Sequence, residues 1–298
     1  MAANSLSQQK KTWTASQVLL VLTMLVFSAL CVIPMLNVLA VSLSSKSAIL
    51  RGDVGLWPVE LTWDAYHGIF RDQSMIWCLL YTVLLTVVYT AMAMVLTILL
   101  AYPLTKKRLH GRKFFTLIVL FTMYFSGGTI PTYLTIKDYG MLNTIWSLIL
   151  PGVISTYNMI ILRSSMAALP EELEEAAIID GANDFQVMLR VTLPLSLASI
   201  ATISLFYAVS KWNSFSDALY YITSRDLQPL QLRLYNIIKG STNVELSVIE
   251  GSSAELGMNI SESIESATIM FATLPILIVY PFVQRYFVTG VTIGAVKG

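Results

Sequence analysis

The stretch LPEELEEAAIIDGANDFQVMLRVTLP, residues 169–194, is the one long, charge-dense passage between two strongly apolar runs in the second half of the chain. Pro170 stands where a helix can begin, because a first turn does not need the N–H that proline lacks. The glutamates that follow it meet the positive end of the helix dipole. Gly181 is expected to end this helix, since glycine adopts a left-handed turn without steric strain.

A second short helix is predicted directly after that glycine. Asn183 and Asp184 are residue types that cap helix N-termini, and Phe185, Met188 and Leu189 then fall on one face. The residues alone leave two interpretations open. One is a solvated loop with two amphipathic helices. The other is a helix–turn–helix that presents a small apolar stripe to a partner before Pro194 opens the next apolar run.

Composition places the chain among integral membrane proteins. Hydrophobic residues make up 55% of its 298 residues and charged residues only 12%. With Lys+Arg 19 against Asp+Glu 18, charge gives no reason to expect nucleic-acid binding. Cys31 and Cys78 lie in apolar runs, where buried structural cysteines are expected rather than a disulfide or a metal site. His67 and His110 lie in loops without partners for metal binding, so no catalytic or metal-binding residue is predicted.

Six stretches are long and apolar enough to cross a bilayer. The first two lie between charged residues at 11 and 46 and at 72 and 106. The other four run over residues 114–136, 139–162, 191–210 and 266–284. The predicted fold class is therefore an all-α integral membrane protein with six transmembrane helices, occupying residues 14–290. Two interruptions are expected, a break in helical propensity at 126–131 in the third span and a kink at Pro151-Gly152 in the fourth.

Basic residues predict the orientation of these spans. They crowd the connection from Lys106 to Lys113 and the N-terminus at Lys10 and Lys11, so both are expected in the cytoplasm. Residues 1–13, the tail 291–298 and the 169–194 loop then also face the cytoplasm. The apolar run after Lys11 is too long for a signal-peptide core, so it is expected to stay as the first span.

Two longer loops are expected on the outer side. The loop at 42–73 contains Trp57, Trp63 and Tyr66, which suit either a membrane interface or contact with an external binding protein. The outer loop at 215–265 is predicted to include a short amphipathic helix at 229–235 and then mobile Ser-, Asn- and Glu-rich sequence.

The 169–194 stretch resembles the EAA loop of binding-protein-dependent ABC importer permeases. The family pattern reads EAA, three residues, G, nine residues, I-x-L-P, and this chain departs from it only at Val191. In that family the loop is a coupling helix that docks in a cleft on a cytoplasmic ATPase subunit, a helix-in-groove contact. The resemblance implies coupling roles for Glu175, Ala176, Ala177, Asp180, Gly181, Phe185, Met188, Leu193 and Pro194.

The chain ends in GVTIGAVKG, residues 290–298. This terminus is similar to that of maltose-type carbohydrate permeases, which end in a comparable Gly-Val-Lys-Gly. The chain looks closest to the permeases for oligosaccharides and polysaccharides, including pectic fragments and alginate. The resemblance implies a type I ABC importer permease fold in the bacterial cytoplasmic (inner) membrane. It further implies a second homologous permease, two ATP-binding subunits and an extracytoplasmic solute-binding protein as partners. ATP and magnesium would be bound by the ATPases, and no cofactor by this chain, which lacks a Gly-Lys-Ser/Thr phosphate loop. Tail contacts with the ATPases would involve Gly294, Val296, Lys297 and Gly298.

Polar residues at membrane depth in the fourth span and toward the outer end of the fifth span are candidates for the substrate path. Asn158 suits either a contact between helices or the lining of a pathway. Tyr207 and Asn213 are placed where they can reach a solute. Lys211 either extends to the lipid headgroups or faces the mouth of the cavity, where it would attract an anionic sugar.

The alternative function is an ion-coupled secondary transporter for a small solute. Such a protein is expected to have ionisable residues inside its spans and inverted repeats. The spans of this chain are free of charge in their interiors, and no internal repeat is evident. These features favour the ATP-driven importer.

Overall fold

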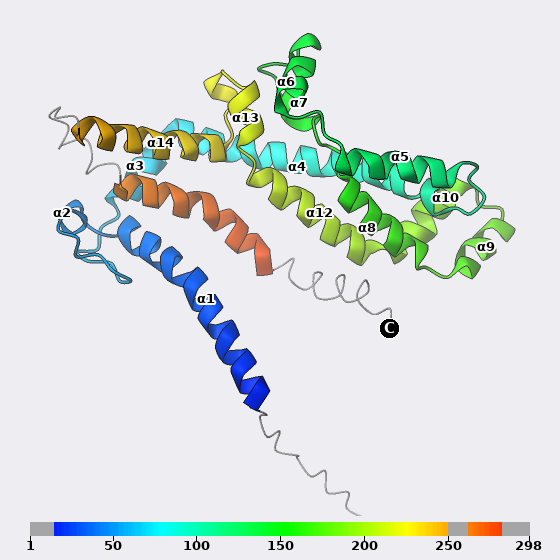
Figure 1. The fold of residues 1–298 in the computed structure, drawn as a ribbon, viewed down its shortest axis with the longest axis horizontal. Coiled ribbons are helices and arrows are strands. Elements are labelled where there is room, and N and C mark those ends of the chain that lie inside the picture. Colours follow the sequence, from blue (N-terminus) through cyan, green and yellow to red (C-terminus); the bar gives the residue numbers. More distant parts are fainter. Residues whose placement is uncertain (1–14, 250–261, 282–298) are drawn as a thin grey trace, which may run out of the picture.

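The computed structural model describes residues 15–249 and 262–281, and these residues form helices and loops without a strand (Figure 1). The N-terminal segment 1–13 and the tail 291–298, with its predicted ATPase contacts, lie outside the described residues. The first half of the chain contains α1 (Ala15–Ser42), α2 (Lys46–Leu50), α3 (Asp64–Arg71), α4 (Gln73–Ala101), η1 (Pro103–Thr105), α5 (Arg112–Tyr124), α6 (Thr129–Asp138) and α7 (Ile145–Ile149). The second half contains α8 (Thr156–Ala167), α9 (Glu171–Ile179), α10 (Asp184–Val187), the π-helical turn η2 (Met188–Thr192), α11 (Leu193–Leu195), α12 (Leu197–Trp212), α13 (Ser216–Tyr221), η3 (Arg225–Leu227), α14 (Leu230–Ile249) and a last helix, Glu262–Pro281.

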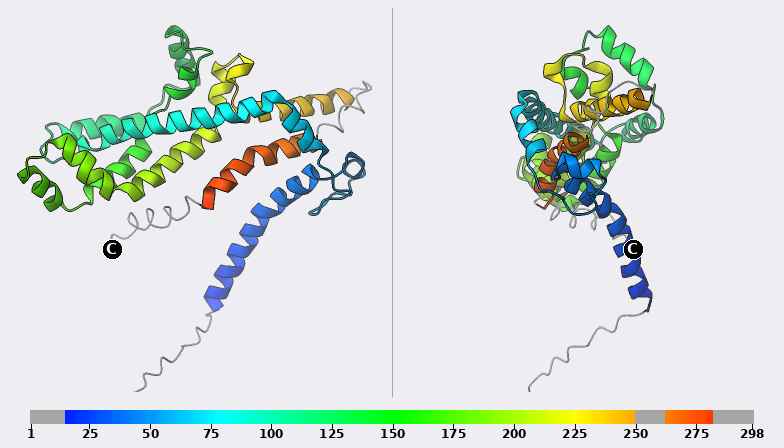
Figure 2. Two further views of the ribbon diagram at one scale, coloured as in Figure 1. Left: turned by 180° about the vertical axis from the view of Figure 1, so that it is seen from behind. Right: turned by 90° about the vertical axis from the view of Figure 1, so that its left-hand side faces the viewer.

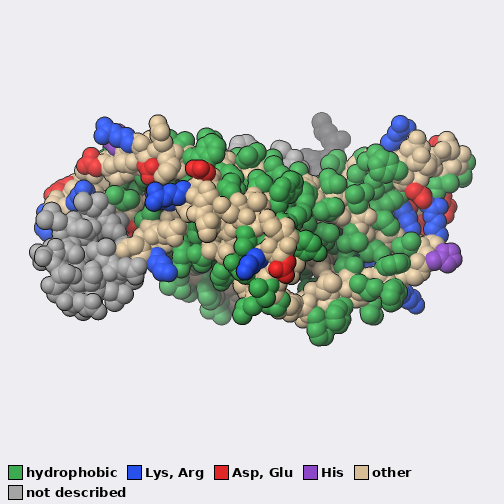
Figure 3. Space-filling model, turned by 90° about the horizontal axis from the view of Figure 1, so that it is seen from above, with side chains coloured by type: hydrophobic (Ala, Val, Ile, Leu, Met, Phe, Trp, Pro, Cys, Tyr) green, Lys and Arg blue, Asp and Glu red, His purple; other side chains and the backbone are tan. Residues whose placement is uncertain are grey.

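Five of the six predicted spans correspond to apolar helical segments. Ala15–Ser42, Gln73–Thr105 and Glu262–Pro281 are each long and apolar enough to cross a membrane. Two further segments meet that test only as bent pairs, α5 with α6 at 110° and Asp184–Leu195 with α12 at 83°. Hydrophobic side chains cover the middle of the molecule, and most charged side chains lie toward its two ends (Figure 3). This distribution suits a protein whose middle lies in a bilayer.

The predicted break at 126–131 is confirmed. Gly128 has φ +85°, a conformation that favours glycine, and α6 turns sharply away from α5 there (Figure 1).

The fourth predicted span is not one helix. The chain leaves the helical conformation between α7 and α8, where Gly152 has φ +74°. Two tyrosine hydroxyls satisfy backbone groups in this break: Tyr89 Oη donates to Gly152 O at 2.8 Å, and Ser155 N–H donates to Tyr207 Oη at 3.0 Å. A complete break is tolerated within the protein because other helices supply these partners.

The central helix is α4, which packs against α8 and α12. Leu85, Met159, Leu162 and Ile203 are almost fully buried between these helices. Most of this core is aliphatic, so the three helices are held together mainly by close packing, with a few hydrogen bonds between them.

Helix α1 diverges from the rest of the bundle (Figure 2). Most of its length is exposed, and Cys31 is exposed with it, so the prediction that this cysteine is buried is wrong, whereas Cys78 is buried. The C-terminal end of α1 is held by the following loop, since Ser42 Oγ and Tyr66 Oη share a hydrogen bond of 2.9 Å. A long apolar helix left uncovered in this way is available for contact with lipid or another subunit.

The predicted outer loop at 215–265 contains more helix than expected, namely α13, η3 and α14. The prediction of mobile sequence directly after residue 235 is wrong, because α14 continues through it. Leu230 and Leu232 are buried, and Leu230 N–H donates to Thr82 Oγ1 of α4 at 2.8 Å. The predicted amphipathic helix therefore exists but continues to Ile249. Its apolar residues pack against α4, a contact that local composition does not reveal.

Candidate functional site

The turn between α9 and α10 has the geometry expected from its glycine. Gly181 has φ +86° and donates its N–H to Ile178 O at 3.0 Å, while Ala182 N–H donates to Ala177 O at 3.0 Å. These two bonds form the Schellman arrangement that closes a helix C-terminus. The start of α9 differs from the predicted start by one position, because Pro170 is the N-cap rather than a residue of the first turn.

Helix α10 begins with a capping box. Asn183 Oδ1 accepts from Gln186 N–H and Gln186 Oε1 accepts from Asn183 N–H, both at 2.9 Å. The helix then widens into the π-turn η2 and continues through α11 toward α12. The Schellman bonds at the end of α9 and the capping box at the start of α10 give the turn between these helices a defined shape.

The apolar stripe on this connection differs from the predicted one. Phe185 and Leu189 are 59% and 46% exposed, but Met188 is buried and faces α4 rather than solvent. Ile179, at the end of α9, is 85% exposed. The exposed apolar surface therefore runs from the end of α9 to α10 and excludes Met188. The remaining predicted coupling residues are exposed (Glu175, Ala176, Asp180, Gly181, Pro194) or half-buried (Ala177, Leu193).

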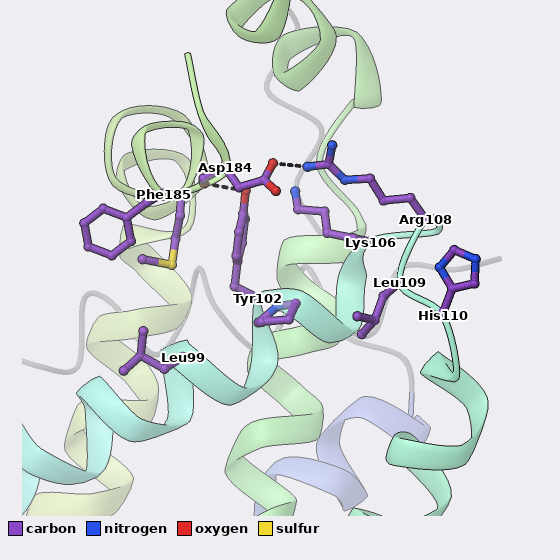
Figure 4. Close-up of a pocket in the computed structure, with 10 residues that line it drawn as sticks. Leu99, Tyr102, Lys106, Arg108, Leu109, His110, Asp184 and Phe185 are labelled. Carbon is purple, nitrogen blue, oxygen red and sulfur yellow. Dashed lines mark hydrogen bonds and ion pairs between the residues drawn. The ribbon is translucent and has the colours of Figure 1, made fainter.

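Three ion pairs join this connection to the basic loop after α4. Lys106 pairs with Glu174, Lys107 Nζ lies 2.6 Å from Glu171 Oε1, and Arg108 pairs with Asp184. Figure 4 shows Arg108 reaching Asp184 beside Lys106 and Tyr102. From the sequence, these cations predict only the orientation in the membrane. The complementary signs of the two loops were the available signal for this contact.

A cavity of about 520 Å³ lies between the end of α4, the basic loop and α10 (Figure 4). Its wall combines aliphatic and aromatic side chains with three basic residues and one carboxylate. It is lined by Leu99, Tyr102, Pro103, Lys106, Arg108, Leu109, His110, Asp184, Phe185 and Met188. Among the residues that the structure describes, no cluster of three or more His, Cys, Asp and Glu side chains could hold a metal ion.

A second cavity, of about 350 Å³, lies beside the break between α7 and α8. Asn158 and Tyr207, two of the substrate-path candidates, line it, whereas Lys211 and Asn213 do not. The lining consists of aromatic rings, hydroxyl groups and one amide, from Tyr89, Gly152, Ser155, Tyr157, Asn158, Phe206, Tyr207 and Ser210. Tyr207 also shares a 2.7 Å hydrogen bond with Thr97 Oγ1, which ties α12 to α4. Asn213 is exposed and donates to Val209 O at 2.9 Å at the end of α12.

Lys211 is buried and does not line this cavity. Its side chain is 6% exposed, with Nζ 3.3 Å from Asp217 Oδ2 and 4.9 Å from the centre of the Tyr89 ring. Neither interpretation of this lysine included the ion pair, and its role in the substrate path stays a prediction. The chain reverses direction after α12, so Asp217 at the start of α13 comes back to meet the cation.

The loop between α1 and α4 contains a polar network around Glu60. Its carboxylate accepts hydrogen bonds from Ser45, Ser47 and Arg51, and these contacts lower its pKa to about 2. Trp57 in the same loop is 81% exposed and Trp63 56% exposed. Both the membrane-interface and the binding-protein interpretations of this loop are compatible with that exposure.

Comparison with known proteins identifies the family, although no family model matches the chain. The polygalacturonan/rhamnogalacturonan transport system permease protein YtcP of Bacillus subtilis is 40% identical over 278 residues, covering 92% of this chain and 96% of the relative. The chain belongs to the permease subunits of carbohydrate ABC transporters. Protein LplC of the same organism is also 40% identical, over 91% of this permease and 90% of the relative. A permease subunit of this kind is not itself an enzyme.

A solved structure shows the same fold. In a bacterial ABC transporter involved in the import of the acidic polysaccharide alginate, one chain matches with a TM-score of 0.82 and 28% identity. The match covers 92% of this permease and 99% of that chain. The predicted all-α fold of a type I importer permease is thereby confirmed. The division into domains and the roles of individual residues stay predictions.

Proposed function

We propose that this permease forms part of the membrane channel of an ATP-driven importer for acidic oligosaccharides or polysaccharides. The observation that supports this most is the 40% identity, over nearly the full length of both chains, to a polygalacturonan/rhamnogalacturonan permease. The transporter with the same fold is involved in the import of alginate, an acidic polysaccharide. Both likenesses point to uronic-acid polymers or their fragments as the cargo.

The α9–α10 connection is the contact to the ATPase in this proposal. Its exposed Ile179 and Phe185 present apolar surface beside the carboxylates of α9, and a short, well-capped helix pair is rigid enough to insert into a groove. The basic loop beside it favours the cytoplasmic side. Both termini would then be cytoplasmic, with the tail residues Gly294, Val296, Lys297 and Gly298 as a second contact to the ATPases.

The remaining subunits follow from the same assignment. Two ATPases would bind ATP and magnesium, and a second, homologous permease would complete the channel and cover apolar surface such as that of α1. An extracytoplasmic solute-binding protein would deliver the sugar. A bacterial alginate ABC transporter is known in complex with a periplasmic protein that holds an alginate pentasaccharide. ATP binding would move α9 and α10 and turn the channel outward, in an alternating-access cycle.

The cavity beside the α7–α8 break is the proposed sugar contact of this subunit. Aromatic rings and hydroxyl groups suit the faces and hydroxyls of sugar rings. The nearby Lys211 is already paired with Asp217. This chain would therefore contribute stacking and hydrogen bonds, and recognition of the sugar's carboxylates would come from its partners.

Reconstitution of the complete transporter in proteoliposomes tests this function. Uptake of galacturonate oligomers should require ATP and the binding protein, and a non-hydrolysable ATP analogue should abolish it. A neutral oligosaccharide of the same length serves as the control. Uptake by this chain alone, driven by a proton or sodium gradient, would instead support a secondary transporter.

A further inference from the structure

Glu174 is the one carboxylate of α9 that points into the protein. Its side chain is 24% exposed, compared with 63% for Glu171, and the neighbouring Glu175 is exposed. Glu174 forms an ion pair with Lys106, which follows α4 and η1, and its Oε1 accepts a 3.2 Å hydrogen bond from Thr192 Oγ1. One side chain therefore connects α9 to the end of α4 and to the turn η2 that leads into α12.

Both partners of Glu174 are themselves held in place. Lys106 is 14% exposed, and its Nζ lies 4.1 Å from the centre of the Tyr102 ring. Tyr102 is buried and donates its hydroxyl to Asp184 O at 3.0 Å. Thr192 is 1% exposed. A contact between side chains with so little freedom loses little conformational entropy, and its partial burial limits screening by salt.

The two other ion pairs between these loops are of a different kind. Lys107 and Glu171 are 76% and 63% exposed, and Arg108 and Asp184 are 59% and 63% exposed. Exposed pairs of long side chains contribute little to the placement of the elements that they join. Among these three ion pairs, the one made by Glu174 therefore contributes most to the placement of α9 against the membrane helices.

Helix α4 extends from this contact to the second cavity, and α12 reaches the same cavity from η2 after the short α11 and a bend of 83°. Tyr89 and Thr97 belong to α4 and Tyr207 to α12, and the Thr97–Tyr207 hydrogen bond joins the two helices near the cavity wall. A displacement of α9 can thus reach the cavity through two rigid helices, which is the kind of contiguous packing that energetic coupling uses.

We propose that Glu174 is a positioning residue that makes α9, the end of α4 and the start of α12 move as one unit. This inference rests on the proposed function, since it assumes that the ATPase moves α9. It assigns the transmission of that movement to the Lys106–Glu174–Thr192 contact. The loss of this contact should leave the ATPase attached but weaken the link between hydrolysis and transport.

The test compares Glu174→Gln, Lys106→Gln and Lys107→Gln in the complete reconstituted transporter. The readout is the amount of sugar taken up per ATP hydrolysed, together with the amount of ATPase that co-purifies. We expect Glu174→Gln and Lys106→Gln to lower the uptake-to-hydrolysis ratio about tenfold with normal co-purification. Lys107→Gln removes the adjacent but exposed lysine and should leave the ratio unchanged.

Two further variants separate coupling from mere stability. The double reversal Lys106→Glu with Glu174→Lys should recover much of the ratio that either single reversal loses. Thr192→Val keeps the ion pair and removes only the hydrogen bond, so its ratio should fall less than that of Glu174→Gln. A wild-type ratio in Glu174→Gln, or a reduced amount of folded protein with an unchanged ratio, would overturn the inference. Neither result would contradict the proposed function. The proposed function fails only if the wild-type complex shows no ATP-driven uptake.

Discussion

Replacement of Gly181 tests whether the turn between α9 and α10 must keep its shape. At φ +86° the position favours glycine, while a Cβ added there would meet no atom within 4 Å. The penalty for a larger residue is therefore conformational rather than steric, about 1–2 kcal/mol for an ordinary L-residue in the left-handed region. That range reduces the population of the native turn roughly 5- to 30-fold. Asparagine tolerates this conformation better than alanine or a β-branched residue.

The assay is ATP hydrolysis by the purified complex in lipid nanodiscs, with and without substrate-loaded binding protein. Gly181→Val should lose most of the stimulation by the binding protein, Gly181→Ala should retain part of it, and Gly181→Asn should remain close to the wild type. The amount of folded permease should be the same in all variants, because the turn is exposed and lies outside the core. Full stimulation in Gly181→Val would refute the assignment of this turn to coupling.

Three further predictions concern other parts of the chain. Deletion of residues 293–298 should weaken complex assembly or ATP hydrolysis without changing the affinity of the binding protein for sugar, and a fully active truncated complex would show that the tail is dispensable. Glu60 has a folded pKa of about 2, below its usual value of 4.5, so its ionised form stabilises the loop above pH 4.5 and this contribution is lost as the pH falls toward 2. Melting temperatures should therefore fall less between pH 5 and pH 3 in Glu60→Gln than in the wild type, and parallel curves would contradict the network. Lys211→Gln leaves Asp217 without its cation and should reduce the free energy of unfolding by about 1–2 kcal/mol, since the lysine is buried but Asp217 is partly exposed. Transport of acidic and neutral oligosaccharides should change by the same factor, and a selective loss of the acidic sugar would place Lys211 in the pathway after all.

Local chemistry explains which features could be predicted from the sequence. The end of α9 and the start of α10 depend on Gly181 and Asn183, whose backbone preferences and capping bonds act within a few residues. The positions of the apolar spans follow from composition in the same way. Features of this kind need no knowledge of the rest of the fold.

Contacts between distant segments explain what could not be predicted. Lys211 is buried beside the ring of Tyr89, which belongs to α4, more than 100 residues earlier in the chain. The break between α7 and α8 is complete because Tyr89 and Tyr207, from two other helices, satisfy its backbone groups. Helix α14 is anchored at its start by Leu230, whose backbone bonds to Thr82 of α4. In each case the deciding partner lies beyond the range of local propensity.

Site-specific photo-crosslinking from Ile179 is the most direct test of the proposal that the ATPase binds at the turn between α9 and α10. This side chain is 85% exposed at the end of α9, so a photoreactive residue there should react with whatever covers the turn in the assembled transporter. Ile130 is 75% exposed and belongs to α6, a helix that lies away from α9 (Figure 1), which makes it the matched control. If the ATPase binds there, we expect a crosslink to the ATPase subunit from position 179 and none from position 130. A complex that transports sugar with ATP but shows no ATPase crosslink from position 179, or shows one from position 130, would contradict it.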